Sequence, residues 1–363
     1  MNSFKTKKTL WLSGLAIMTA AVMTSCSSDE PSESLPENKR QEISFAANMA
    51  FAERSGDYTT NNLKKFYTYA YTGSDTVPSL FMDNVEVTKG GANTWTYSPV
   101  TYWPANSDVD FYAYAPEGWV PATGPLFPIP YDNYWADTDL IYAVSPNLRA
   151  TTILQSQVVF NFRHALSKVT VKLSSNNKSL RVQVSNVALA GLNTQANFNF
   201  PRETTVGSAH PSKWLWTDHN TPTPMLLHMS QTPGDVINLT STPNDMSAGG
   251  WGGPKYIIPQ PLYWDSNGEG KDTYITIMCS VYDAKTGEKL WPNANTAPDK
   301  LVPGSKFADG LLKFPLSSTN IPNYEAGWSY VYNLIVNSNE DMGQIQFGTP
   351  TVYGWDEVTA TYD

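Results

Sequence analysis

The residues with the widest chemical use in this chain are its histidines, and their spacing matches no catalytic or zinc arrangement. His210, His219 and His228 recur nine residues apart in loop-like sequence, without the cysteines or short histidine pairs of zinc sites. His164 follows an alternating strand pattern, which favours a structural hydrogen-bonding role. The chain also lacks a G-x-S-x-G elbow, a phosphate-binding glycine loop and an H-E-x-x-H motif. We therefore expect no catalytic residue, no metal and no cofactor.

Carboxylates and aromatic rings occur together around Trp135. Asp132, Asp137 and Asp139 lie close to it in the sequence, a mixture that could contact a glycan or a calcium ion. Calcium needs six or more oxygen ligands, and these carboxylates are not spaced as in a calcium-binding loop. A solvated loop whose aromatic rings cap the fold is the favoured interpretation, and Trp135 stays a candidate glycan contact.

Trp214 and Trp216 form a second candidate glycan contact. Side chains two residues apart in an extended chain point to the same side, so the two indole rings could make a stacking platform for a sugar. Packing of the rings in a core is the favoured alternative.

The first 26 residues indicate export and lipidation. Three lysines precede an apolar stretch from Leu10 to Met23, which at about 14 residues is shorter than the roughly 20 that span a bilayer. A basic start and a short apolar segment predict a signal peptide over residues 1–25. Met23-Thr24-Ser25-Cys26 resembles a lipobox, so we expect lipid on Cys26. An ordinary signal peptide with an incidental cysteine is the alternative.

Composition after the signal peptide excludes several classes of protein. Residues 26–40 are acidic and contain prolines but no aromatic residue, which predicts a disordered tether. Without residues 1–25 the net charge falls from −9 to −12, because three lysines and no acids are removed. A chain this acidic, with no basic run, is not expected to bind nucleic acid. If Cys26 carries lipid, Cys279 has no disulfide partner and is expected to be an inert core thiol.

Composition and periodicity predict an all-β fold. Abundant aromatic residues (20 Tyr, 14 Phe, 12 Trp) with 26 Pro and 23 Gly favour short strands joined by turns. Alternating or continuous apolar patterns predict strands at 41–51, 65–72, 95–97, 109–114, 140–144, 157–162, 169–173, 182–189, 275–281 and 330–336. We expect two β-sandwich domains, an N-terminal one at 41–155 and a C-terminal one at 156–363.

The first predicted strand has the most regular alternation. Its apolar face carries Ile43, Phe45, Ala47, Met49 and Phe51, with small or polar residues between them. A polar, turn-forming run follows and contains Arg54. The pattern predicts a strand with one buried face.

Several segments, in order, resemble the fimbrillin-like proteins, the pilin subunits and tip adhesins of Bacteroides-type Gram-negative anaerobes. The segments are Thr101-Tyr102-Trp103-Pro104 with the following 109–116, an F-x-H-x-L-x-K-V match at 162–169, and 330–334 with a later Trp355. The resemblance runs from the lipobox to the C-terminus. It implies two tandem transthyretin-like (Greek-key) β-sandwich domains, no enzymatic activity, and a lipid-anchored outer-membrane precursor that reaches the cell surface and the fimbrium.

The resemblance also implies a maturation mechanism. A trypsin-like protease cuts after an arginine that follows the first strand, and loss of residues 41–54 opens a groove that a strand from another subunit fills. Arg54 is the candidate cleavage site. Arg40 is the runner-up, although a cut there would leave the strand in place. The candidate donor strand is the alternating segment with Val358, Ala360 and Tyr362.

Two questions stay open at the level of the sequence. Stalk, tip and anchor subunits are not distinguished, since tip subunits of the family tend to lack a usable C-terminal donor and only eight residues follow Trp355. The implied partners are other fimbrial subunits, in a homo- or heteropolymer, the maturation protease, and a host or bacterial surface ligand. The alternative function is a permanently anchored, glycan-binding surface lipoprotein that uses Trp135, Trp214 and Trp216.

Overall fold

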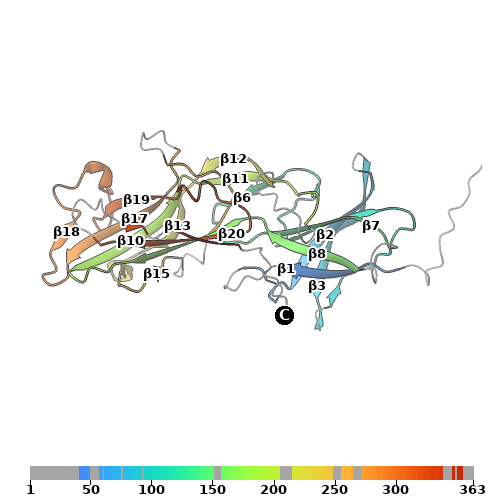
Figure 1. Cartoon of the computed structure of the whole chain (residues 1–363), viewed down its shortest axis with the longest axis horizontal. Helices are drawn as coiled ribbons and strands as arrows, with labels where there is room; N and C mark the ends of the chain where they lie inside the picture. Colours follow the sequence, from blue (N-terminus) through green and yellow to red (C-terminus); the bar gives the residue numbers. More distant parts are fainter. Residues whose placement is uncertain are drawn as a thin grey trace, which may run out of the picture. The chain divides into compact units, whose positions relative to one another are not determined.

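The protein is built from β-sheets, shown in a computed structural model (Figure 1). The structure describes residues 41–49, 57–59, 61–74, 77–91, 94–150, 157–204, 215–247, 255–264, 271–337, 346–347 and 350–354, all within one compact unit. These residues form four sheets and two short 3-10 helices, η4 (Pro233–Asp235) and η5 (Pro298–Lys300). None of the described helices is long and apolar enough to span a membrane. The predicted all-β class is confirmed.

The largest sheet has seven strands and carries the first strand of the fold at one end. In spatial order its strands are β1 (Ser44–Met49), β8 (Gln157–His164), β7 (Ile141–Leu148), β5 (Val109–Ala115), β2 (Lys65–Ser74), β3 (Val77–Lys89) and β4 (Trp95–Thr96). The middle strands β2, β5 and β7 are buried on both faces, because alternate residues of these strands enter two different cores. On β2, Phe66 and Ala70 enter one core, while Tyr67 and Tyr69 enter the other.

The strand β8 lies between β1 and β7 in this sheet (Figure 1). The sequence places the start of a C-terminal domain at residue 156, so this expected boundary falls before a strand of the first sheet. The chain leaves that sheet at Ala165 and Leu166, which are buried, and enters another sheet at Ser167.

A three-stranded sheet covers the tyrosine face of the large sheet. Its strands are β6 (Ile129–Asp132), β11 (Asn193–Phe198) and β12 (Trp216–Pro222), with β11 in the middle. The rings of Phe198 and Trp216 lie 5.1 Å apart and pack in one cluster with Tyr114 and Tyr142 of the large sheet. This aromatic core joins segments that are far apart in the sequence.

Two further sheets enclose a third core, which is mainly aliphatic. One contains β13 (Met225–Met229), β10 (Leu180–Ala190), β17 (Tyr274–Asp283) and β18 (Lys289–Trp291), with β14 (Ile237–Asn238) on β10 and β19 (Gly310–Pro315) on β17. The other contains β15 (Asn244–Asp245), β9 (Ser167–Ser174), β20 (Trp328–Ile335) and β21 (Gln346–Phe347), with β16 (Lys255–Ile257) on β9 and β22 (Thr351–Gly354) on β20.

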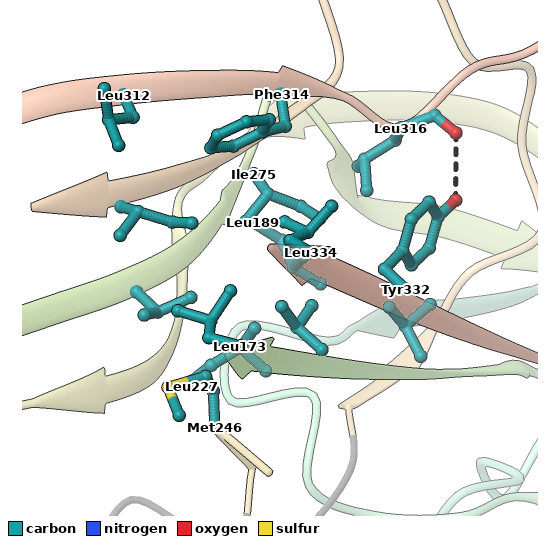
Figure 2. Packing of buried hydrophobic residues seen from close by; sticks show 14 of the residues in the cluster. Leu173, Leu189, Leu227, Met246, Ile275, Leu312, Phe314, Leu316, Tyr332 and Leu334 are labelled. Carbon is teal, nitrogen blue, oxygen red and sulfur yellow. Dashed lines mark hydrogen bonds between the residues drawn. The ribbon is translucent and has the colours of Figure 1, made fainter. Parts of the chain in front are cut away.

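Aliphatic side chains from these two sheets meet in the core between them. Figure 2 shows Leu173 of β9 and Leu334 of β20 beside Leu189 of β10 and Ile275 of β17. Each of the four is at most 2% exposed. Interdigitation of two such apolar faces is the packing expected of a β-sandwich.

This third core also contains the hydroxyl of Tyr332 and the thiol of Cys279. The Tyr332 hydroxyl donates a hydrogen bond to the carbonyl of Leu316 at 2.9 Å (Figure 2). Cys279 lies on β17 and is fully buried, and burial raises the pKa of its thiol well above the ordinary value. The thiol therefore stays protonated and unreactive, in agreement with its place in the alternating pattern.

Candidate assembly site

The first strand pairs with β8 along one of its edges. The two strands run parallel, with Ser44 opposite Gln157 and Met49 opposite Phe162 (Figure 1). The side-chain amide of Gln157 also donates to the carbonyl of Phe45 at 3.4 Å. Because the side-chain pattern of a strand repeats every two residues, this ladder sets which side chains of β1 face the core.

The residues just before β1, Gln41 to Ile43, are bonded to the segment that follows β4. The Ile43 N–H donates to the Thr101 carbonyl at 3.0 Å, and the Trp103 N–H donates to the Gln41 carbonyl at 2.9 Å. The Tyr97 hydroxyl donates to the Ile43 carbonyl at 2.8 Å. Strand β4 is the far end of the same sheet, so residues 41–43 link the two ends of the sheet through the segment after β4. Removal of residues 41–49 would leave the edge of β8 and the backbone groups of Thr101 and Trp103 without these partners.

The ring of Phe45 lies at the centre of the apolar surface on which β1 packs. We call this surface, formed around Phe66, Tyr97, Phe111 and Phe160, the seat of β1. The Phe45 ring stacks on Phe160 with ring centroids 5.6 Å apart and an interplanar angle of 12°. It makes edge-type contacts with Tyr97 at 5.2 Å, Phe111 at 6.1 Å and Phe66 at 6.2 Å. Four aromatic partners from four different segments thus form a pocket that a large side chain on a replacing strand would have to fill.

Burial holds β1 firmly in this seat. Ile43, Phe45 and Met49 are each at most 7% exposed, and burial of each such side chain contributes roughly 1.5–3 kcal/mol. A backbone cut after the strand breaks none of these contacts. The cut makes β1 a separate peptide, so that β1 no longer rebinds at the high effective concentration that covalent attachment gave it. Another strand with equal or better contacts can then compete for the seat.

The described part of the first strand has the face expected from the sequence. Ile43, Phe45 and Met49 are buried, Ala47 is half-buried and Asn48 is exposed. The remaining predicted site residues of the maturation and donor segments lie outside the described residues: Cys26, Arg40, Phe51, Arg54, Val358, Ala360 and Tyr362.

Trp216 does not belong to an exposed stacking platform. It is only 4% exposed, and its indole N–H donates to the carbonyl of Ala165 at 2.7 Å. The ring is covered because β12 packs in the aromatic core, which the local pattern of alternation cannot reveal. Trp214, its expected companion, lies outside the described residues.

Trp135 is accessible, as a sugar contact requires. Its side chain is 64% exposed and packs edge-to-face against the exposed ring of Tyr134, with centroids 4.9 Å apart. The nearby carboxylates do not converge on it. Asp132 accepts hydrogen bonds from the backbone N–H of Tyr134 and from Gln195, whereas Asp139 is buried.

The described histidines serve separate local contacts. His164 is fully buried, with Nδ1 3.0 Å from an Asp139 carboxylate oxygen, which confirms its structural role. His219 bonds the carbonyl of Pro259 at 2.7 Å, and His228 bonds the hydroxyl of Ser230. Among the described residues, no three His, Cys, Asp or Glu side chains come together in a way that could hold a metal ion.

A surface pocket of about 660 Å³ lies at the ends of β2, β5 and β7. Tyr71, Tyr112 and Phe200 form part of its wall, and the Tyr112 ring meets the other two edge-on at 6.0 and 5.7 Å. Phe127, which is 63% exposed, and the carboxylate of Asp110 also line it. The pocket therefore combines fixed aromatic rings with a polar group.

The sequence did not identify the segment that bonds to the residues just before the first strand. Thr101 and Trp103 occur in one of the segments that resemble the fimbrillin-like proteins, but their role depends on backbone bonds to residues almost 60 positions earlier. Local periodicity carries no information on such a long-range contact.

Comparison with known proteins gives one family and several similar folds. The fimbrillin-like family model matches residues 52–355. A crystal structure from Bacteroides uniformis, provisionally named as a cell adhesion protein, is 15% identical with a TM-score of 0.50, and the match covers 88% of this chain and 99% of that one. A fimbrial protein from Bacteroides vulgatus is 14% identical (TM-score 0.47, 87% and 99% covered), and a fimbrilin from Porphyromonas gingivalis is 11% identical (TM-score 0.46, 88% and 98% covered).

No curated protein sequence matches the chain. The family model nevertheless spans most of it, and the Bacteroides uniformis structure has a similar fold over almost its entire length. The chain therefore belongs to the fimbrillin-like family of non-enzymatic fimbrial proteins.

Proposed function

We propose that the protein is a structural subunit of a cell-surface fimbria that supports adhesion and assembles by protease-triggered strand exchange. The observation that carries the proposal is the position of β1. It pairs with β8 along one edge, the residues just before it bond to Thr101 and Trp103, and Phe45 fills an aromatic pocket beneath it. A strand of another subunit can use the same edge of β8 and the same pocket once β1 has left.

The order of segments in the chain supports this mechanism. Cys26 would carry lipid and hold the precursor in the outer membrane, and residues 26–40 would act as the tether. Arg54 follows the strand, so a trypsin-like cut there would free lipid, tether and strand together. A cut at Arg40 would leave β1 attached to the rest of the chain.

The length of the seat sets a requirement for the donor. The six residues of β1 span about 20 Å at roughly 3.3 Å per residue. A donor strand should place a large apolar side chain at the position of Phe45 and a smaller one two residues later, at Ala47. The segment with Val358, Ala360 and Tyr362 carries one large ring and a small residue two positions from it, and is our candidate donor.

Limited proteolysis in vitro tests the proposal. The precursor without its signal peptide, with Cys26→Ser, should remain monomeric until trypsin removes residues up to Arg54, and should then polymerise. An excess of a synthetic peptide of residues 41–54 should prevent polymerisation, whereas the same peptide with Phe45→Ala should not. Electron microscopy and size-exclusion chromatography measure the outcome. Polymer growth from uncut chains, or cut chains that stay monomeric, would contradict the proposal.

Adhesion through a sugar is a second candidate function, supported by the pocket beside Phe127. Aromatic faces that stack on sugar rings, with a carboxylate such as Asp110 to accept hydroxyl hydrogen bonds and with Arg202 and Glu203 also in the wall, suit a saccharide. The exposed Trp135 supplies another stacking face at a different place.

A glycan array with the mature protein should separate these candidates. Phe127→Ala should weaken binding about tenfold if the pocket holds the sugar, since loss of one stacking ring costs roughly 1.4 kcal/mol. Trp135→Ala should do the same if the exposed loop is the site. Tyr263→Ala, which removes a ring that is 50% exposed elsewhere, is the matched control. Equal binding by all variants, or no bound glycan, would contradict a sugar site at either place.

A further inference from the structure

A buried ion pair holds the chain immediately after the proposed cleavage site. The Lys168 ammonium lies 2.6 Å from Oδ1 of Asp57 and also contacts Oδ2. The Tyr256 hydroxyl donates a further hydrogen bond to Oδ1 at 2.9 Å. Asp57 is 3% exposed and the other two residues are 2% exposed, so the carboxylate has exchanged water for these partners. We call these three residues the polar anchor.

The partners of Asp57 are matched to its charge. A buried carboxylate is stable only when donors and a counter-charge replace its water, and Lys168 supplies the counter-charge. Burial and the carboxylates of Asp139 and Asp57 raise the pKa of Tyr256, so its hydroxyl stays protonated and donates. Loss of either partner would leave part of the carboxylate unsatisfied.

Bonds made by the residues that follow Asp57 extend the fixed region toward β2. The Tyr58 N–H donates to Oδ2 of Asp139 at 2.9 Å, and the other oxygen of Asp139 faces His164. The Thr59 N–H donates to the side-chain oxygen of Asn62 at 2.6 Å. Asp57, Tyr58 and Thr59 are therefore each held by side chains before β2 begins.

No part of the polar anchor comes from β1. Lys168 lies on β9 and Tyr256 on β16, two neighbouring strands of a sheet that does not contain β1. Lys168 and His164 both belong to the F-x-H-x-L-x-K-V segment at 162–169, and both serve the stretch that starts at Asp57. Removal of β1 would leave all of these bonds in place.

We propose that the polar anchor fixes the new N-terminus of the cut chain and sets the downstream limit of maturation. The inference rests on the proposed cleavage at Arg54, which lies three residues before Asp57. After that cut only Ser55 and Gly56 precede the anchored residue. The anchor keeps Asp57 and the two residues after it away from the vacated seat, so that the groove stays open for a donor strand, and it limits access of the protease to the next basic residues.

Lys64 and Lys65 make this inference testable, because trypsin can cut after either one. Both side chains are exposed. The pairing of β2 with β3 and the ion pairs of Lys65 with Glu86 and Glu117 also protect these sites, so the anchor adds to a protection that β2 already gives. Cleavage of a native segment follows the population of its locally opened state, so loosening of the anchor should raise the rate of cleavage at these sites.

The experiment digests the full precursor chain in detergent with trypsin and identifies N-termini over time by mass spectrometry. The wild type should stop at Ser55. The double variant Asp57→Ala/Lys168→Met removes both charges together and should yield chains that begin at Lys65 or Phe66 at least tenfold faster than the wild type. Tyr256→Phe, which keeps the ring and removes one bond to Asp57, should raise this rate severalfold. Asp309→Asn is the matched control, because it weakens a carboxylate that is equally buried but bonded to Ser185 and Ser280.

The outcomes separate the anchor from the proposed function. If Ser55 appears in the wild type and both anchor variants keep the wild-type rate at Lys64 and Lys65, the anchor inference is overturned. It is also overturned if Asp309→Asn accelerates these cuts as much as the double variant does, since general destabilisation would then suffice. If the double variant does not fold, Tyr256→Phe decides by the same comparison. An absence of cleavage at Arg54 would instead count against the proposed maturation. The rates of cleavage at Lys64 and Lys65 would still show whether the anchor protects these sites.

Discussion

Replacement of Arg54 by alanine should abolish filament formation and leave a folded, lipidated precursor in the outer membrane. A trypsin-like protease requires a basic side chain before the scissile bond, so the variant would retain residues 26–54. Strand β1 would then stay paired with β8, with Gln41 and Ile43 bonded to the segment after β4, and no donor could enter. Immunoblots for chain length and electron microscopy for filaments measure both effects.

Arg40→Ala is the matched control for this prediction. A cut at Arg40 would leave β1 attached, so this variant should assemble like the wild type. Undiminished filaments from Arg54→Ala would rule out Arg54 as the switch. Loss of filaments in Arg40→Ala alone would move the cleavage site to Arg40 and would contradict removal of β1 as the trigger.

Phe45→Ala should lower the free energy of unfolding of the uncut chain by about 3–5 kcal/mol, the usual cost of truncating a buried phenylalanine. The ring contacts Phe160 and three other aromatic rings, so the loss leaves a cavity in the centre of the seat. The same substitution should not affect the cut chain once the released peptide has been removed, because Phe45 leaves with the strand.

Phe160→Ala provides the comparison, since Phe160 lies on β8 and remains after the cut. Its ring also packs on Phe66 and Phe162, so the substitution should destabilise the uncut and the cut chain alike. Urea denaturation of the four combinations measures the difference. An equal effect of Phe45→Ala on both forms would mean that β1 still occupies its seat after cleavage.

Much of the fold follows from local alternation in the sequence. The patterns at 109–114, 169–173 and 275–281 predict strands that the structure contains as β5, β9 and β17. These strands have one or two faces in a core, and burial of alternate residues is what produces the signal. The core position of Cys279 follows in the same way.

The strands and contacts that alternation missed depend on other parts of the chain. Strand β3 is mostly exposed to solvent, including the side chains of Val77 and Leu80, so its sequence shows no apolar alternation. It forms a strand because its backbone pairs with β2. Trp216 is buried, as the favoured interpretation expected, but the distant strands that cover it cannot be named from its local sequence.

One part of the candidate assembly site follows from local alternation, and the other part depends on long-range contacts. The apolar face with Ile43, Phe45 and Met49 was predicted because it is a local pattern. The bonds of Gln41 and Ile43 to the segment after β4 join residues roughly 60 positions apart. The ion pair between Asp57 and Lys168 joins residues 111 positions apart. No local rule predicts such pairs.

The N-terminal residue of the subunits in filaments tests removal of β1 most directly. Sheared filaments and the cell-envelope fraction should be purified separately, and their N-terminal peptides identified by mass spectrometry. We expect Ser55 as the first residue in filaments and acylated Cys26 in the envelope precursor. Acylated Cys26 at the start of the chain in both fractions would contradict assembly through loss of the first strand.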